Sequence, residues 1–330
     1  NSEAAIILGG GGGNSLGNHN RRVSSATAQQ FWDDFSNEKK QTLPAEFPKG
    51  FRSFYVMKSE LTQGEYARFL NLIDSSQQGT RNPSPNVSVG EEHRYAISPD
   101  APFRVVPYNR AANWLSWMDV AAFADWSGLR PMSELEFEKA ARGDRYPGPG
   151  EFAWGPEAPP AGKYVLQDDD TPEELISNQG PGANVAFDGT IGLVSSVSGP
   201  LRVGGFVPLA ASRLGFGGSY YRVTEMSGNV AEMVVTVGRS VGRRYQGRHG
   251  DGELSPAGNA AGEEVEWWPG ARRAARGGYE VLNADGIGTR GGDWTFGIRR
   301  LQVSDREDIN KPADHRGMRW GGRLARSVDR

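Results

Sequence analysis

The chain has 330 residues, a formal net charge of −3 and no cysteine. The missing thiols exclude disulfides, thiolate nucleophiles and cysteine-bound metal sites, and the mixed charge argues against a nucleic-acid partner. No apolar run reaches the roughly 18 residues of a membrane span, so we expect a protein that does not cross the membrane.

We interpret residues 1–50 as an N-terminal extension made of a Gly-rich arm and a short helix. The arm is either a flexible linker or a strand that adds to the sheet edge of a neighbouring molecule. Residues 27–40 carry aromatic side chains at helical spacing, which predicts the short helix. The chain begins with Asn1 and not Met, as a cleaved signal peptide would leave it, so we expect a secreted or cell-surface protein. The apolar residues of the arm, which precede five glycines, are the candidate assembly residues Ala4, Ala5, Ile6, Ile7 and Leu8.

Residues 51–330 form the second predicted unit, a single domain. Aromatic and β-branched residues alternating with polar ones predict a strand over 51–60. Thr62 and Glu65 form a capping box that opens a helix over 62–73. Two further helices are expected within residues 109–143, and Ser133 with Glu136 opens the second of them. Short apolar runs separated by Gly, Pro, Asn and Asp follow, so the pattern indicates an α+β fold.

Five motifs in order give the domain a family resemblance. They are "YVMKSELTQGEYARFL", the Trp- and Ala-rich block over 117–143, "SGNVAEMV" at 227–234, "RGGDW" at 290–294 and "GMR" at 317–319. Together they resemble the formylglycine-generating enzyme family, the sulfatase-modifying-factor domain, over about residues 51–326. The resemblance implies a C-type-lectin-like fold of short twisted antiparallel sheets, a few helices and extensive irregular loops.

The resemblance also bears on activity. Enzymes of this family oxidise a substrate cysteine with two active-site cysteines that bind copper. By spacing, those places fall here at about Phe296 and Leu301, and neither side chain can ionise or bind a metal. We therefore expect no formylglycine-generating activity and no copper.

A second branch of the superfamily uses non-haem iron held by histidines. The four histidines here, His19, His93, His249 and His315, are far apart in the sequence and share no helical face. We expect no iron, and a non-haem iron oxidoreductase is retained as an alternative function.

Relatives in this family hold structural calcium, so the resemblance implies two candidate calcium sites in this chain. The first is Asn229 and Glu232 with the carbonyl of Val230 between them, and the second is Asn184 with Asp188. Oxygen ligands at such spacing supply part of a calcium shell. The alternative is a turn-capping Asn229 and a paired core carboxylate at Glu232.

A tolerant scaffold without its reactive residues is suited to binding. In the first hypothesis the protein has a structural or assembly role, and its partner is itself or another surface protein. In the second it is a ligand-binding receptor resembling the variable proteins of diversity-generating retroelements, which place diversified residues near this C-terminal region. Internal pairing with carboxylates is the main alternative role of the arginines. The candidate binding residues are Trp294, Phe296, Arg299, Arg300, His315 and Arg319.

Overall fold

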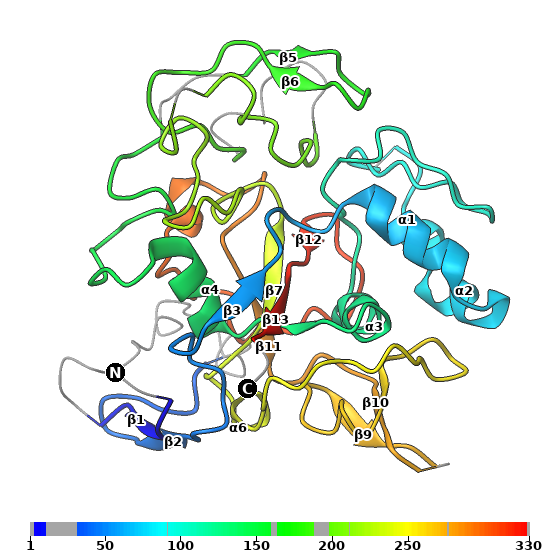
Figure 1. Cartoon of the computed structure of the whole chain (residues 1–330), viewed down its shortest axis with the longest axis vertical. Helices are drawn as coiled ribbons and strands as arrows, with labels where there is room; N and C mark the ends of the chain where they lie inside the picture. Colours follow the sequence, from blue (N-terminus) through cyan, green and yellow to red (C-terminus); the bar gives the residue numbers. More distant parts are fainter. Residues whose placement is uncertain are drawn as a thin grey trace.

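The computed structural model describes residues 3–10, 32–90, 92–159, 164–187, 198–210, 212–275 and 277–328. Within them, short helices and small sheets are joined by long loops, which confirms the expected α+β class (Figure 1). The strands are β1 (Ile6–Leu8), β2 (Gln41–Leu43), β3 (Phe54–Val56), β4 (Arg130–Pro131), β5 (Leu166–Gln167), β6 (Leu175–Ile176), β7 (Ala231–Val235), β8 (Ala261–Gly262), β9 (Ala271–Arg273), β10 (Tyr279–Val281), β11 (Ile287–Arg290), β12 (Trp320–Gly321) and β13 (Leu324–Ser327). The helices are α1 (Gln63–Leu72), α2 (Ser75–Arg81), α3 (Trp117–Trp126), α4 (Glu134–Arg142), α6 (Ser240–Arg243) and the 3₁₀ turns η3 (Ser84–Asn86) and η4 (Ile298–Leu301).

Two three-stranded sheets form the centre of the molecule. In one, β7 lies between β11 and β12, and every residue of β7 is buried. In the other, β13 lies between β3 and β4. A bridge from Ser133 to Val235 connects the start of α4 to β7. These contacts bring the C-terminal strands against the first predicted strand of the domain, as Figure 1 shows.

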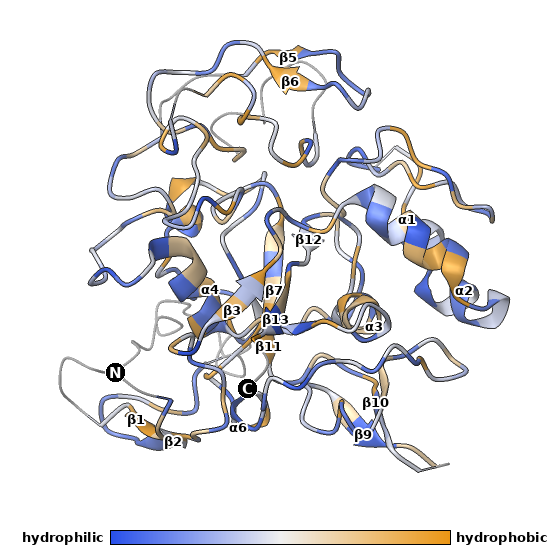
Figure 2. Ribbon diagram, in the orientation of Figure 1, coloured by the Kyte–Doolittle hydropathy of each residue, from blue (hydrophilic) through white to orange (hydrophobic). Residues whose placement is uncertain are grey.

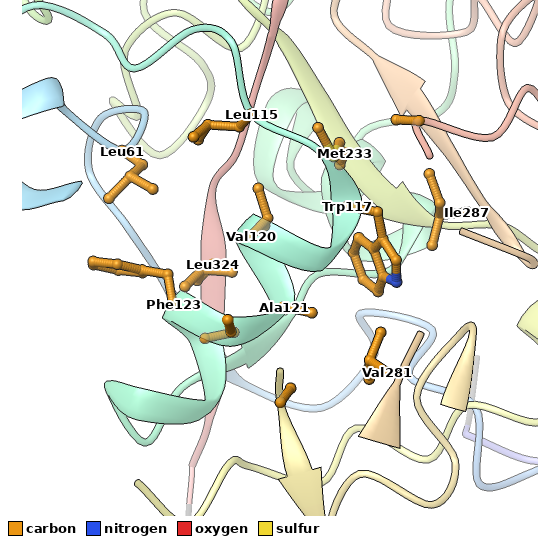
Figure 3. Packing of buried hydrophobic residues seen from close by; sticks show 14 of the residues in the cluster. Leu61, Leu115, Trp117, Val120, Ala121, Phe123, Met233, Val281, Ile287 and Leu324 are labelled. Carbon is orange, nitrogen blue, oxygen red and sulfur yellow. The ribbon is translucent and has the colours of Figure 1, made fainter. Parts of the chain in front are cut away.

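Helix α3 supplies much of the main core. Its residues Trp117, Val120 and Ala121 are fully buried, and they belong to one cluster with Leu61 and Met233 (Figure 3). Figure 2 shows the corresponding hydrophobic colouring of α3 and β7, whereas the loops mix both colours. Burial of a side chain as large as Trp117 contributes roughly 1.5–3 kcal/mol, so this helix fixes the centre of the domain.

The local signals in residues 51–143 are confirmed, with two refinements. Thr62 with Glu65 and Ser133 with Glu136 form capping boxes that open α1 and α4. Helix α3 begins later than its apolar stripes suggest, because Ser116 is its N-cap and Trp114 has a left-handed φ of 59°. Helix α2 was not predicted, since its sequence SSQQGTR has no apolar periodicity.

The predicted helix over 27–40 is wrong in the part that the structure describes. Residues 32–40 form turns and bends, while residues 27–31 lie outside the described ranges. Phe35 is buried in the main core, and the carboxylates of Asp33 and Asp34 pair with Arg306 and Arg243. Long-range contacts therefore override the helical pattern.

The N-terminal strand pairs within the chain. Residues of β1 are antiparallel to β2, with Ile6 opposite Leu43. Leu8 is buried in the main core, whereas Ile6 and Ile7 are 40% and 56% exposed. The glycines from Gly11 to Gly13 lie outside the described residues. In the part of the chain that the structure describes, no helix is long and apolar enough to cross a bilayer.

Candidate functional site

The turn after β11 positions the candidate site. Gly291 and Gly292 have φ values of 86° and 70°, a conformation that side chains disfavour. A Cβ on Gly292 would also lie 2.8 Å from the carbonyl oxygen of Arg300, so the turn packs directly on η4. The Gly228 N–H donates to the Gly291 carbonyl at 2.8 Å, and the Trp294 N–H donates to the Asn229 carbonyl at 2.9 Å. Two sequence motifs, at 227–234 and 290–294, are thereby joined.

Phe296 lies at about the first of the two places where the family resemblance puts an enzyme's cysteine. The Cζ atoms of Arg300 and Arg319 each lie 4.7 Å from the centroid of its ring. Cations over an aromatic face are attracted by its quadrupole, so the three side chains stabilise one another. Leu301, at the second place, is completely buried in a hydrophobic cluster.

Little space remains beside these side chains. The cavity next to Phe296 has a volume of about 10 Å³ and is lined by Gly291, Gly292, Arg300, Asp305 and other residues of this turn. That volume admits a single water molecule at most. This cavity therefore offers no room for a larger ligand.

The two arginines differ in their charge partners. Arg300 has the carboxylates of Asp305, Glu307 and Asp308 at 3.4 Å. Arg319 donates to Thr295 Oγ1 at 3.4 Å, and in the described residues no carboxylate lies within 4.0 Å of it. Arg300 is therefore paired internally, whereas Arg319 interacts at longer range with the buried Asp293.

The remaining candidate binding residues are spread out. Trp294 is buried, and its ring centroid lies 5.2 Å from that of His93. The Arg299 side chain is 66% exposed and lies 3.8 Å from Glu307. His315 is exposed and rests on Trp320, 4.6 Å between ring centroids. The structure thus groups Phe296, Arg300 and Arg319, and it leaves Trp294 in the interior.

Asp293 is a buried carboxyl group beside the site that was not among the candidate site residues. Its side chain is fully buried, and its Oδ1 accepts hydrogen bonds from the Thr295 N–H at 2.7 Å and from Thr295 Oγ1 at 2.6 Å. Burial raises the pKa of Asp293, while the Thr295 hydrogen bonds and Arg319 act in the opposite direction. Its place in "RGGDW", where the family motif carries Ser, was the available signal.

The predicted calcium ligands at the first site are engaged with other groups. Asn229 Nδ2 donates to Glu60 at 2.5 Å, and Asn229 Oδ1 accepts from the Leu201 N–H at 2.8 Å. The Val230 N–H donates to Glu60, and Glu232 pairs with Arg323 at 2.7 Å. The guanidinium of Arg323 holds Glu232 Oε1, so that oxygen is engaged in an ion pair.

The second predicted site is described only in part. Asn184 accepts from the Gly180 N–H at 2.9 Å and donates to the Gly215 carbonyl at 2.6 Å. Asp188 lies outside the described residues. Within the described ranges no group of three or more His, Cys, Asp or Glu side chains is placed to hold a metal ion. Calcium binding stays a prediction at both places.

Three buried carboxylates surround the one guanidinium of Arg323. They belong to Glu60, Glu225 and Glu232. Burial raises the pKa of Glu60 well above its ordinary value, and the charge of Glu225 raises it further. Since burial also raises the pKa values of Glu225 and Glu232, this cluster is an interior polar network that favours protonated carboxyl groups.

Comparison with known proteins agrees with the motifs. The family model described as "Sulfatase-modifying factor enzyme 1-like domain" matches residues 11–328. No curated protein sequence matches the chain. Among solved structures, PvdO from Pseudomonas aeruginosa is similar at 16% identity and a TM-score of 0.43, covering 98% of this chain and 92% of that one. Treponema denticola variable protein 1 is similar at 14% identity and a TM-score of 0.40, covering 89% and 90%.

Proposed function

Because the chain belongs to the family of sulfatase-modifying factor enzyme 1-like domains and contains no cysteine, we propose that it is a non-catalytic binding protein. In this proposal it is secreted or displayed at a cell surface, and it uses the family scaffold to bind another protein or a second copy of itself. The observation that carries the proposal is the contact of Phe296 with Arg300 and Arg319 beside a cavity of only about 10 Å³.

The chemistry of the family's thiol oxidation supports this proposal. That reaction needs thiolates that bind copper and receive the substrate cysteine, and here the two places hold a phenyl ring and a buried leucine. The cavity beside Phe296, at about 10 Å³, is itself too small for a substrate side chain. Incubation of the protein with copper and a cysteine-containing peptide tests the proposal, and we expect no more formylglycine to form than with copper alone.

A receptor for small anionic ligands is a second candidate, favoured by Arg319. Among the described residues no carboxylate lies within 4.0 Å of its guanidinium, which donates to Thr295 Oγ1 and acts at longer range on Asp293. Substitution Arg319→Gln removes the charge and keeps part of the hydrogen bonding. A receptor would lose affinity for its ligand in this variant, whereas an assembly role through the arm would be unaffected.

Self-association through residues 4–8 is the finer form of the assembly proposal. Strands β1 and β2 form a two-stranded sheet within the chain. A neighbouring molecule could supply its own β1 to β2 in place of this one, as in a domain swap. Light scattering of the intact chain and of the Ile7→Lys variant tests this proposal. Ile7 is exposed, so its substitution leaves the buried Leu8 in place.

The iron-oxidoreductase alternative receives no support from the placement of the described histidines. His249 accepts from the Ser327 N–H at 2.9 Å, His93 stacks near Trp294, and His315 rests on Trp320. His19 lies outside the described residues. Iron analysis of the purified protein is the direct check.

A further inference from the structure

A groove of about 470 Å³ runs between strand β3 and helix α4, away from the Phe296 site. Its apolar lining includes Val56, Ala140 and Val223. Strand β3 lies at the edge of the sheet β3–β13–β4, and Figure 1 shows β3 and α4 next to each other. The groove therefore has a strand edge on one side and a helix on the other.

The free edge of β3 offers unpaired backbone groups. The Met57 N–H donates to the Leu324 carbonyl at 3.0 Å, and in an antiparallel pair alternate residues turn their peptide groups toward the partner. Tyr55, opposite Arg326, therefore also faces β13, whereas the N–H and C=O groups of Phe54 and Val56 face the opposite edge. Among the described strands β3 pairs with β13 alone, and the free edge ends at Val56, because the Thr224 N–H donates to the Lys58 carbonyl at 3.0 Å.

Exposed aromatic side chains border this edge. Phe51 is 57% exposed, Tyr55 is 67% exposed and Tyr221 is 50% exposed, and all three line the groove. Such exposed rings lose little conformational entropy when they cover a partner, so they are typical of binding surfaces.

The groove is also cationic. Lys58 and Lys139 line it, together with Arg52, and no acidic side chain is among the described residues that do so. Glu138, the acidic neighbour on α4, is engaged with Arg142 and Arg290. Glu3 lies beside Arg52, because its Oε1 accepts from the Arg52 N–H at 2.7 Å, so the positive charge that a partner would meet is mainly that of Lys58 and Lys139.

Positive charge continues beyond Tyr221. Tyr220 makes an edge contact with Tyr221 at 4.9 Å between centroids, and Arg145 lies over the Tyr220 ring at 5.3 Å. Burial is the main cause that lowers the pKa of Arg213, and the nearby charges of Arg145 and Arg222 lower it further. Among the described residues, none of these arginines has a carboxylate within 4.0 Å.

We propose that this groove binds an extended acidic peptide segment of a partner protein as an added strand beside β3. The free peptide groups of Phe54 and Val56 hydrogen-bond its backbone, and alternate side chains pack on the aromatic residues. Acidic side chains of the peptide pair with Lys58 and Lys139. A polysaccharide offers no amide ladder to the strand edge, so the free backbone favours a peptide.

A fluorescent peptide of alternating glutamate and valine is the probe, and anisotropy measures its binding to the full chain. We expect binding that weakens by about tenfold or more in the double variant Lys58→Glu/Lys139→Glu. The matched control is Arg273→Glu/Lys311→Glu, which reverses two exposed cations outside the groove and should bind as the parent does. A lysine–valine peptide should not bind.

Val56→Pro tests the added strand itself. Proline removes the outward N–H of Val56 and leaves the Met57 bond to β13 in place, so binding should be lost while the circular dichroism spectrum is kept. If this variant does not fold, Tyr221→Ser replaces it and should weaken binding. Absence of binding by the acidic peptide, or equal binding by the charge-reversed protein, overturns the proposal. So does binding of a polyuronate in place of the peptide.

Discussion

Asp33 and Arg306 are 273 positions apart in the chain and form a buried ion pair, with Oδ2 and Nη1 2.7 Å apart. The same guanidinium reaches Glu134 Oε2 at 2.7 Å, so it joins the N-terminal segment, α4 and the C-terminal loop. Removal of one partner leaves charge in the interior, which typically costs about 3–5 kcal/mol.

We therefore expect Asp33→Ala to lower the free energy of unfolding by roughly 3 kcal/mol. Asp34→Ala is the matched control, because Asp34 is less buried in its pair with Arg243 and should cost about 1 kcal/mol. Denaturant unfolding followed by tryptophan fluorescence measures both. Equal, small losses would show that residues 32–50 are not held to the domain by this pair.

Phe296 should contribute to stability through its two arginines. Replacement by leucine keeps an apolar side chain but removes both cation–π contacts, each worth about 0.5–1 kcal/mol. We expect Phe296→Leu to lose about 1–2 kcal/mol and Phe296→Tyr to retain most of the stability. Thermal unfolding of the two variants compares them. Identical melting temperatures would mean that the guanidinium groups do not hold the ring.

Asp125 should make stability depend on pH. Its carboxylate accepts from the N–H groups of Asp251 and Ala261, and burial raises its pKa to about 7. The folded protein therefore keeps a proton that the unfolded chain releases near its ordinary value. This contribution is present at low pH and is lost as pH rises toward 7, by up to about 1.4 kcal/mol per pH unit.

The variant Asp125→Asn should flatten the decline in melting temperature between about pH 5 and pH 7. Asp285→Asn, at an exposed position, controls for the loss of one negative charge and should leave the profile unchanged. A variant profile parallel to that of the parent would assign the pH dependence to other groups, such as Glu60 or Glu225.

Calcium should have no large effect on the intact protein at the Asn229 site. Arg323 already supplies the positive charge beside Glu232, and Asn229 is hydrogen-bonded to Glu60 and to Leu201. We expect the same melting temperature in excess calcium and in excess chelator. A rise of several degrees with calcium would show that the ion binds, and isothermal titration of the Asn229→Ala and Asn184→Ala variants would then assign the site.

Local signals in the sequence predicted local structure well. The capping boxes at Thr62 and Ser133 depend on residues three positions apart, and both open the helices expected there. The box of Ser116 with Asp119 has Asp where Glu is the usual residue, and the start of α3 within residues 109–143 was not predicted. The helix predicted over residues 27–40 was wrong over 32–40, because those residues are held by partners far away in the chain, such as Arg306.

At the candidate site, too, local features were predicted and long-range contacts were not. The motifs located the turn at 290–294 and the residues around it, since spacing along the chain carries that information. The cation–π contact of Arg319 with Phe296 could not be predicted from the sequence, because it depends on how β12 pairs with β7. The groove beside β3 was also not predicted, as a free strand edge is defined only by the complete sheet order.

Mass spectrometry of a cysteine-containing peptide incubated with the protein, copper and oxygen is the most direct test of the central claim. With Phe296 and Leu301 in place of the two cysteines, we predict that no formylglycine forms and that the Phe296→Ala variant is equally inactive. Formation of the aldehyde by the purified chain, above the rate with copper alone, would contradict a binding role without catalysis.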